Sequence, residues 1–459
     1  MQLSFYGAAQ SVTGSKHLIT LDNGKRILLD CGLVQGKNGK NKDYNSDFLF
    51  KPETIDFLVL SHAHIDHCGL IPLLVRKGFN GKIFCTPPTI ELCKILLEDS
   101  AKIQENEVRD KNTEKAEPLF TFEDVDKSLS LFTPVEYDTP YKIEEDIELL
   151  FTDAGHILGS AVVNLTIQED GKEKHIAFTG DVGRYCNRIL KSPQTFPQAD
   201  VIICESTYGD KLHESIDNTE DRLLRTVNYT CVEKKGNLII PAFSIGRTQE
   251  LIFSLNKLAE EKRLPDVEVF IDSPLSVYAT DIMRNNKKYF NDEMHRYLEF
   301  DPDPFGFDQL HFVLKRTDSK EINKVEKPSI IIASSGMMEG GRIVYHLKQN
   351  ISDPKNTILI TGYCEPETLG GKITRGAEEV EILGEMLPVK AEVVFMNEYS
   401  AHADYGDLLK LLIRQDKEKI EQIFLVHGEP RTMSAFKDTL HAQGFKNVKV
   451  AEFRMSYDL

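Results

Sequence analysis

The feature that most constrains this chain is a dense cluster of polar residues placed directly after a short apolar run. Phe57-Leu58-Val59-Leu60 predicts a buried strand, and Ser61-His62-Ala63-His64-Ile65-Asp66-His67 follows it without a break. Four side chains able to bind a metal therefore lie within six residues. In a loop, alternate side chains can point the same way. We expect any further ligands to follow other strands that end at the same place.

The cluster predicts two metal ions. His62 and His64 can bind one ion, while Asp66 and His67 bind the second. Imidazole and carboxylate ligands together suit zinc, manganese or iron. The alternative is a polar turn with a surface histidine, which would explain a lone histidine better than it explains this spacing.

Three further candidates each follow a predicted strand and stand beside a glycine, which permits a close approach of the backbone. They are His156 after Ile147–Phe151, Asp181 after His175–Phe178, and His427 after Ile423–Val426. Asp181 is the best candidate for a carboxylate that bridges both ions. Two ions about 3.5–4 Å apart would activate a water and stabilise charge on a displaced phosphate oxygen.

The strand pattern of residues 1–208 differs from that of the middle of the chain. Leu18–Leu21 and Arg26–Gly32 flank Asn23-Gly24, a hairpin signal. Strands with helices outside them, such as Thr89 to about Val108, favour a layered sandwich.

Residues 209–390 instead alternate strand and helix, which is typical of a parallel α/β domain. The first pattern returns over residues 391–459, so the sequence predicts one domain interrupted by an inserted second domain. The ligand surface of a parallel sheet lies at the carboxyl ends of its strands. Ser334, Ser335 and Gly336 fall at such a position.

Length and charge limit the function without deciding it. A chain of 459 residues is expected to form two domains. The net charge of −17 argues against a generic nucleic-acid binder, although a metal centre and a local basic cleft can hold phosphates on an acidic protein. No long apolar run predicts a membrane span, and irregularly spaced cysteines favour a reducing, cytoplasmic setting.

With this ligand order, the chain resembles the metallo-β-lactamase superfamily. Three further segments resemble the motifs of its β-CASP ribonuclease group: Cys204-Glu205-Ser206-Thr207-Tyr208-Gly209, Tyr399-Ser400-Ala401-His402-Ala403-Asp404 and Leu425-Val426-His427-Gly428-Glu429. The likeness spans essentially the whole chain. It points to bacterial and archaeal relatives of the nuclease subunit of the cleavage and polyadenylation specificity factor. The implied fold is α/β, an αββα sandwich with an inserted parallel α/β β-CASP domain.

The resemblance implies a role for each site residue. One zinc would be held by His62, His64, His156 and Asp181, and the second by Asp66, His67, Asp181 and His427. Asp30 would orient ligands. His402 would be the general acid, with Glu205 fixing its tautomer and Asp66 also counted as catalytic. A histidine at 427 resembles the RNA-directed branch of the group, since the DNA-directed branch typically has valine there.

Basic and turn residues of the middle segment are candidates for substrate contacts. Backbone amides of the Ser334-Ser335-Gly336 turn favour phosphate oxygens, and Arg247, Arg342 and Lys372 are plausible phosphate partners. The alternative is that these are turn residues and solvated charges.

The leading hypothesis is a zinc-dependent ribonuclease that cuts single-stranded RNA internally, from the 5′ end, or both. The first alternative is a hydrolase of small esters or thioesters, which would use the same metal centre. The second is a catalytically silent RNA-processing scaffold, which would not use the centre for catalysis. Homodimers are common in the resembling group, so a homodimer is an additional expectation.

Overall fold

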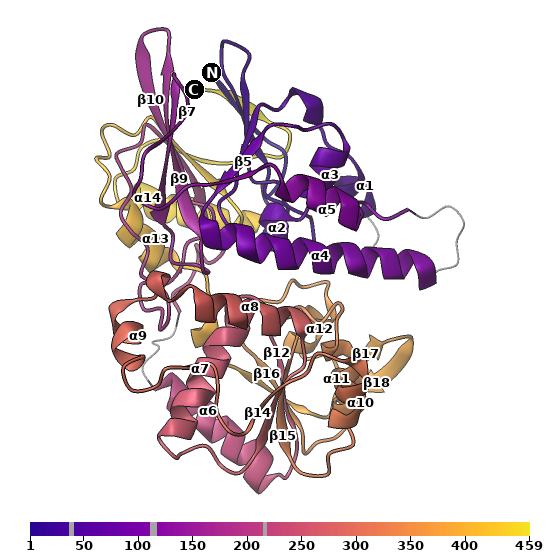
Figure 1. Ribbon diagram of the computed structural model, residues 1–459. Helices are drawn as coiled ribbons and strands as arrows, with labels where there is room; N and C mark the ends of the chain where they lie inside the picture. Colours follow the sequence, from indigo (N-terminus) through magenta and orange to yellow (C-terminus); the bar gives the residue numbers. More distant parts are fainter. Residues whose placement is uncertain (36–40, 111–116, 214–217) are drawn as a thin grey trace. The chain divides into compact units, whose positions relative to one another are not determined.

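The computed structural model describes residues 1–35, 41–110, 117–213 and 218–459, and these form two compact units (Figure 1). Residues 1–35, 41–110, 117–212 and 402–459 make up the first unit, which therefore contains both ends of the sequence. Residues 218–401 make up the second.

Two seven-stranded sheets form among the described residues of the first unit. One has the order β22 (Ser456–Asp458), β1 (Gln2–Phe5), β2 (His17–Thr20), β3 (Arg26–Leu29), β4 (Phe57–Val59), β5 (Lys82–Cys85) and β6 (Phe132–Pro134). The other has the order β21 (Val448–Val450), β20 (Gln422–Val426), β11 (Val201–Glu205), β10 (Lys172–Phe178), β9 (Ala161–Glu169), β8 (Ile147–Asp153) and β7 (Tyr141–Glu144). The predicted hairpin at Asn23-Gly24 is confirmed by the antiparallel pairing of β2 with β3.

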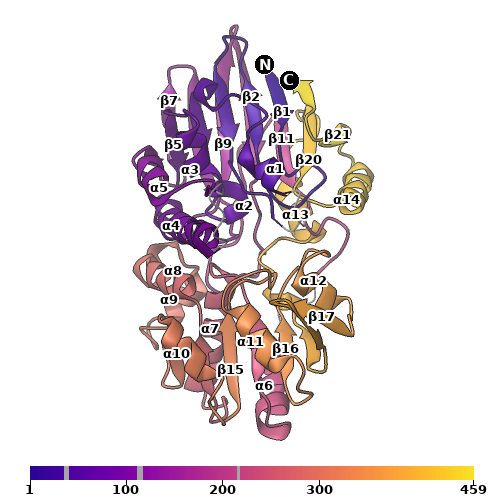
Figure 2. The same ribbon diagram turned by 90° about the vertical axis from the view of Figure 1, so that its right-hand side faces the viewer.

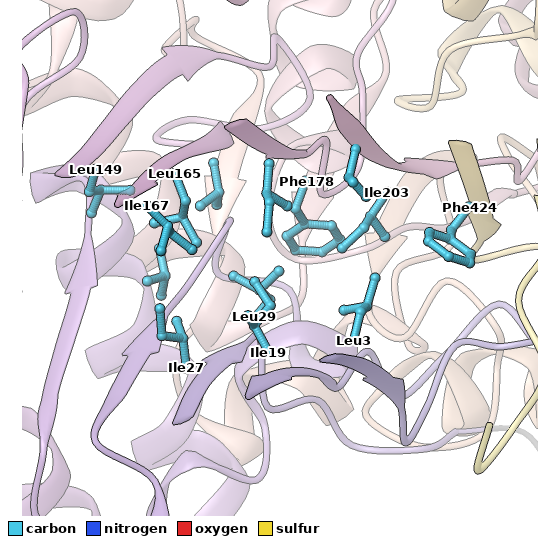
Figure 3. Packing of buried hydrophobic residues seen from close by; sticks show 14 of the residues in the cluster. Leu3, Ile19, Ile27, Leu29, Leu149, Leu165, Ile167, Phe178, Ile203 and Phe424 are labelled. Atoms are coloured by element: carbon cyan, nitrogen blue, oxygen red, sulfur yellow. The ribbon is translucent and has the colours of Figure 1, made fainter. Parts of the chain in front are cut away.

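The faces of the two sheets that meet are apolar because alternate residues of each strand point to the same side. In Figure 3, Leu3, Ile19, Ile27 and Leu29 of one sheet face Leu149, Leu165, Ile167, Phe178, Ile203 and Phe424 of the other. Leu28 lies between Ile27 and Leu29 and is also fully buried, although it points the other way. Both faces of this sheet are therefore covered, as a layered sandwich requires.

Helices cover the outer faces of the sandwich (Figure 2). Leu408 and Leu411 of α13 (Tyr405–Leu412), with Phe436 of α14 (Pro430–Ala442), pack on Ile202 and its neighbours on the second sheet. The first sheet is accompanied by α1 (Asn41–Ser46), the short 3₁₀ helix η1 (Pro52–Thr54), α2 (Ile65–Cys68), α3 (Ile71–Arg76), α4 (Pro87–Asp110) and α5 (Phe122–Leu129). The predicted αββα sandwich is confirmed.

The second unit is built on a parallel sheet whose described strands have the order β14 (Leu310–Phe312), β13 (Glu268–Ile271), β15 (Ser329–Ala333), β12 (Leu238–Pro241), β16 (Thr357–Ile360) and β19 (Glu392–Phe395). A separate hairpin pairs β17 (Glu379–Ile382) with β18 (Glu385–Pro388). The helices are α6 (Thr219–Val227), α7 (Arg247–Glu260), α8 (Pro274–Asn285), α9 (Asp292–Tyr297), α10 (Arg316–Ile322), α11 (Ile343–Asn350) and α12 (Leu369–Thr374), with 3₁₀ turns η3 (Lys287–Tyr289) and η4 (Asn397–Tyr399). The predicted parallel α/β domain is confirmed.

Two details differ from the sequence prediction. Strand β19 was assigned to the returning segment, but it pairs in parallel with β16, so the second unit extends to Ala401. A four-residue apolar strand reads the same in either domain, which is why the pattern could not decide its membership. The helical pattern of residues 219–234 also predicts one continuous helix, whereas the structure has α6 followed by one stretch of π-helix, η2 (Asn228–Glu233). Within the described ranges, no helix is long and apolar enough to cross a membrane.

Candidate metal centre

Four strand ends of the first unit, with the helix that follows one of them, bring the predicted ligands together. His62 and His64 follow β4, and Asp66 and His67 lie on the adjoining helix α2. On the other sheet, the remaining ligands lie just beyond β8, β10 and β20, which carry His156, Asp181 and His427 respectively. Strands β10, β11 and β20 are parallel neighbours, so their carboxyl ends meet at one edge of the sheet. The topology therefore gathers residues that are far apart in the sequence.

Gly180 allows the segment that carries Asp181 to lie close to the loop that carries His62. Its φ is +54°, and a Cβ atom there would lie 2.6 Å from Cβ of Ser61. Any side chain at this position would push the strand that carries Asp181 away from the loop that carries His62. The sequence prediction that a glycine beside the ligand permits close approach holds at this position.

The first ligand group consists of His62, His64, His156 and Asp181. The His64 Nδ1 atom lies 3.1 Å from Nε2 of His62 and 3.1 Å from Nε2 of His156. The Asp181 Oδ2 atom lies 3.5 Å from His62 Nε2 and 3.6 Å from His156 Nε2. Three imidazole nitrogens and one carboxylate oxygen therefore converge on one point.

The second ligand group consists of Asp66, His67 and His427, with the other oxygen of Asp181 beside it. His427 Nε2 lies 3.3 Å from His67 Nε2 and 3.3 Å from Asp66 Oδ2. Asp181 Oδ1 lies 3.3 Å from His67 Nε2 and 3.6 Å from His427 Nε2. One carboxylate thus faces both groups, the position the sequence assigned to a bridging ligand.

The polar atoms of this centre do not all satisfy one another, and this fits a metal. Asp181 Oδ1 is buried and accepts no well-aligned hydrogen bond among the described residues. Neighbouring imidazole nitrogens 3.1–3.3 Å apart can share at most one proton per contact. Buried polar atoms without partners are costly unless something between them binds their lone pairs. Nitrogen and oxygen donors in this number suit zinc, with manganese or iron as alternatives.

The charges of the centre shift the pKa values of its groups in opposite directions. Burial lowers the pKa of His64 to about 4. Burial alone would raise the pKa of Asp181, but the imidazoles of His427 and His67 outweigh it and hold that pKa well below its usual range. Metal ligands must be deprotonated to bind, so both shifts favour binding.

Asp30 holds several groups of this centre in place. It follows β3, is fully buried, and has a φ of +58°. Its Oδ2 atom lies 2.6 Å from Nδ1 of His67, and its Oδ1 accepts the backbone N–H of Ser61 at 2.8 Å. The contact with His67 leaves Nε2 of that ring facing the second ligand group, the geometry that the predicted orienting role of Asp30 requires.

His402 and Glu205 lie beside the metal ligands. Glu205 ends β11 and is fully buried, and its Oε1 lies 3.4 Å from Nδ1 of His402. The side chain of His402 retains 21% exposure, so it can meet a substrate. Burial would lower the pKa of His402, but the carboxylates of Glu205 and Asp181 outweigh it and raise that pKa. A carboxylate on Nδ1 directs Nε2 outwards as the proton-donating atom.

The predicted substrate residues all belong to the second unit, at or after the carboxyl ends of its strands. Arg247 at the start of α7 is buried and, with Gly336, Phe243 and Gly362, lines an open pocket of about 210 Å³. Ser334 donates to Ser273 at 2.9 Å, whereas the buried Oγ of Ser335 has no partner in the described part of the chain.

The two other basic candidates differ from each other. The guanidinium of Arg342 donates to Oδ1 of Asp272 at 2.5 Å and to the carbonyls of Val313 and Leu314. Lys372 is exposed on α12. Arg342 is thus engaged within its own unit, while Lys372 presents its charge to solvent.

Two hydroxyl residues of the centre were not identified from the sequence. Ser61 lies between Asp30 and His62, and Thr207 lies between Glu205 and His427. Both stand next to or near a motif residue, but a lone serine or threonine is too common for its position alone to signal a role.

Domains of known protein families match most of the chain. Residues 18–202 match the metallo-beta-lactamase superfamily domain, residues 248–373 the Beta-Casp domain, and residues 386–451 the Zn-dependent metallo-hydrolase RNA specificity domain. The chain is 34% identical over 453 residues to Ribonuclease TTHA0252 of Thermus thermophilus, covering 99% of each chain. It is 32% identical over 456 residues to an RNase J-like protein of Methanocaldococcus jannaschii, covering 98% of this chain and 97% of that one. It is also 32% identical to Transcription termination factor FttA of the same organism, covering 96% of this chain and 69% of that protein.

Proposed function

Because the chain belongs to the metallo-β-lactamase superfamily, in the group that carries Beta-Casp and RNA-specificity domains, we propose that it is a zinc-dependent ribonuclease that hydrolyses phosphodiester bonds of single-stranded RNA. The observation that carries the proposal is the convergence of seven ligand residues, with a carboxylate-held histidine beside them. The similarity to Ribonuclease TTHA0252 of Thermus thermophilus supports RNA as the substrate.

The donor set supports two ions, one in each ligand group, with Asp181 facing both. When bound, such ions supply positive charge that makes a water nucleophilic near neutral pH and offsets charge on a phosphate. Asp66 and His427 would both hold the second ion, since their ligand atoms are 3.3 Å apart.

In this proposal, His402 donates a proton to the leaving oxygen of the cleaved bond. Three features support the role: its raised pKa, its partial exposure and its contact with Glu205 through Nδ1. The leaving group of phosphodiester hydrolysis is an alkoxide, which needs a proton, and a positioned general acid typically contributes about 10²–10⁴-fold to such a step. Arg247, Ser335 and Lys372 of the second unit are proposed to contact RNA phosphates.

The test is cleavage of a labelled single-stranded RNA and of the DNA with the same sequence, by purified protein supplied with zinc or manganese. We expect RNA to be cut and the His402→Ala variant to retain its metal while losing about 10²–10⁴-fold in rate. The position of the label in the products separates internal cuts from cuts that begin at the 5′ end.

Two results would oppose the proposal. Stoichiometric metal with no cut in either strand would favour a hydrolase of small esters or thioesters. An unchanged rate of RNA cleavage in His62→Ala would remove the metal from the reaction altogether.

A further inference from the structure

We propose that Thr207 is a positioning residue whose hydroxyl sets the ring tautomer of His427 for metal binding and, through the same contact, fixes the carboxylate that holds His402. Thr207 Oγ1 lies 2.6 Å from Oε2 of Glu205 and 3.0 Å from Nδ1 of His427. The inference deepens the proposed function, and its meaning for catalysis rests on that function.

The tautomer follows from counting protons. A threonine hydroxyl has one proton to donate and lone pairs to accept with, while a carboxylate can only accept. Donation to Glu205 at 2.6 Å is charge-assisted and short, so this bond takes the proton. Towards His427 the hydroxyl must then accept, which requires the ring proton to be on Nδ1. The Nε2 lone pair of His427 is thereby directed at Asp66 and His67.

The opposite arrangement would block the metal. If Thr207 donated to Nδ1 of His427, the ring proton would move to Nε2 and point at His67 Nε2, 3.3 Å away. It would also leave Oε2 of Glu205 with the more distant backbone N–H of Thr207, at 3.3 Å. Both consequences are unfavourable, because a proton would occupy the space between ligands and Oε2 of the buried Glu205 carboxylate would lose its shorter hydrogen bond.

The same arrangement occurs a second time, in the first ligand group. Ser61 Oγ donates to Oδ2 of Asp30 at 2.9 Å and lies 3.0 Å from Nδ1 of His62. The Nε2 atom of His62 then faces Asp181 and His64. Each ligand group therefore has one histidine whose tautomer is set by a hydroxyl held on a buried carboxylate, and the two hydroxyls come from the ends of different strands.

Thr207 differs from Ser61 in what its carboxylate does next. Glu205 Oε1 accepts the backbone N–H of Val182 at 2.6 Å and faces His402. Asp30 instead contacts His67, a ligand. Removing the Thr207 hydroxyl should therefore disturb a metal ligand and the general acid together, whereas removing the Ser61 hydroxyl should disturb only ligands.

The experiment compares Thr207→Val, which keeps the branched shape but lacks the hydroxyl, with Thr207→Ser, which keeps the hydroxyl. Zinc content after dialysis, competition with a chromophoric chelator and the visible spectrum of the cobalt-loaded protein are measured without RNA. Thr226→Val is the matched control, because the Thr226 hydroxyl bonds the carbonyl of Arg222 in the other unit.

We expect Thr207→Val to keep one tightly bound ion and to bind the second about 10–100-fold more weakly, since partners of ligating histidines typically contribute that much. Thr207→Ser should restore both the affinity and the cobalt spectrum, and Thr226→Val should match the unmodified protein. In RNA cleavage at saturating zinc, Thr207→Val should lower kcat more than it raises KM.

The inference is overturned if Thr207→Val binds both ions as the unmodified protein does, or if Thr207→Ser binds as weakly as Thr207→Val. Thermal unfolding of all variants identifies a loss of metal affinity that comes from misfolding. If Thr207→Val does not fold, the comparison of Thr207→Ser with the unmodified protein decides, and weaker metal binding by a folded Thr207→Ser overturns the inference. Loss of one ion in Thr207→Val together with no RNA cleavage by the unmodified protein would support the inference and refute the proposed function.

Discussion

In the first unit, polar side chains at the strand ends converge with their ligand atoms facing one another, and Asp181 Oδ1 has no hydrogen-bond partner in the described residues. In the second unit, Asp272 stands at the same kind of position, after β13, yet it is saturated: Arg342, His346 and Ser319 all bind it, at 2.5–2.7 Å. The residue types are similar, but Asp181 leaves one buried carboxylate oxygen without a hydrogen bond, whereas both oxygens of Asp272 are bonded.

This difference in hydrogen bonding distinguishes a cluster that binds a ligand from a cluster that stabilises the fold. Buried polar groups are normally hydrogen-bonded, so a cluster that leaves lone pairs facing one another requires an additional ligand. A cluster that is closed on itself instead holds its segments together. Here Asp272 connects α11, through Arg342 and His346, to the end of β13, next to the Ser334-Ser335-Gly336 turn. The predictions below test this distinction, in order of decreasing effect.

Asp181→Ala should have the largest effect, because one carboxylate serves both ligand groups. We expect loss of most bound metal and a fall in the rate of RNA cleavage of about 10³-fold or more. The reason is that the bound ions stabilise transition-state charge by several kcal/mol, and each 1.36 kcal/mol changes the rate about tenfold. Elemental analysis and single-turnover cleavage measure the two effects. Full metal occupancy in this variant would refute the bridging position.

Asp272→Asn should destabilise the protein without affecting metal binding. Breaking a buried ion pair by removing one partner costs about 3–5 kcal/mol, because the remaining charge is left uncompensated. Urea unfolding measures the loss, and zinc content measured in parallel should stay at the level of the unmodified protein. A variant that lost zinc while keeping its stability would show that the two clusters cannot be told apart in this way.

Asp153→Asn should change how stability depends on pH. Burial raises the pKa of Asp153 to about 7, whereas the unfolded chain has the ordinary value of 3.8. The folded protein therefore holds this proton more tightly, so the stabilisation is complete below about pH 4 and is lost as pH rises towards 7.

Asparagine cannot ionise, and it can still accept the N–H of Gly155, which lies 2.8 Å from Oδ1 of Asp153. The variant should lack this decline and gain on the order of a few kcal/mol over the unmodified protein at pH 8. Unfolding midpoints between pH 4 and 8.5, compared pairwise, measure the effect. Parallel curves for the two proteins would contradict it.

Lys372→Ala should have the smallest effect, because the residue is exposed. If Lys372 contacts one phosphate, its loss should reduce the slope of log affinity against log salt by about 0.7 for single-stranded RNA. Binding of a non-cleavable RNA at several salt concentrations tests this, with Lys324→Ala as a matched exposed lysine that pairs with Glu321. Equal slopes for both variants would remove Lys372 from the proposed RNA contacts.

The sequence predicted the layers of the fold and the seven ligand candidates because both depend on local patterns. A strand followed at once by His62, His64, Asp66 and His67 can be recognised within ten residues, and glycines marked the other ligands after their own strands. Parallel pairing of β10, β11 and β20 then brings strand ends together by topology.

What could not be predicted depends on packing between distant segments. Whether Arg342 faces solvent or Asp272 is decided by how α11 lies against β13, and nothing near residue 342 encodes it. The hydroxyls of Ser61 and Thr207 gain their roles from carboxylates and imidazoles on other strands. Short edge strands such as β19 and β22 carry too few residues for their partner to be read from periodicity.

The order of the ligands along the chain has a consequence for synthesis. Every member of the first ligand group has been synthesised once Asp181 has been added to the chain, but the second group waits for His427, beyond the whole second unit. At about 5–20 residues per second, this interval lasts on the order of tens of seconds. During this stage the nascent chain contains all four residues of the first ligand group but lacks His427 of the second, so the proposed second site can be completed only with the final segment.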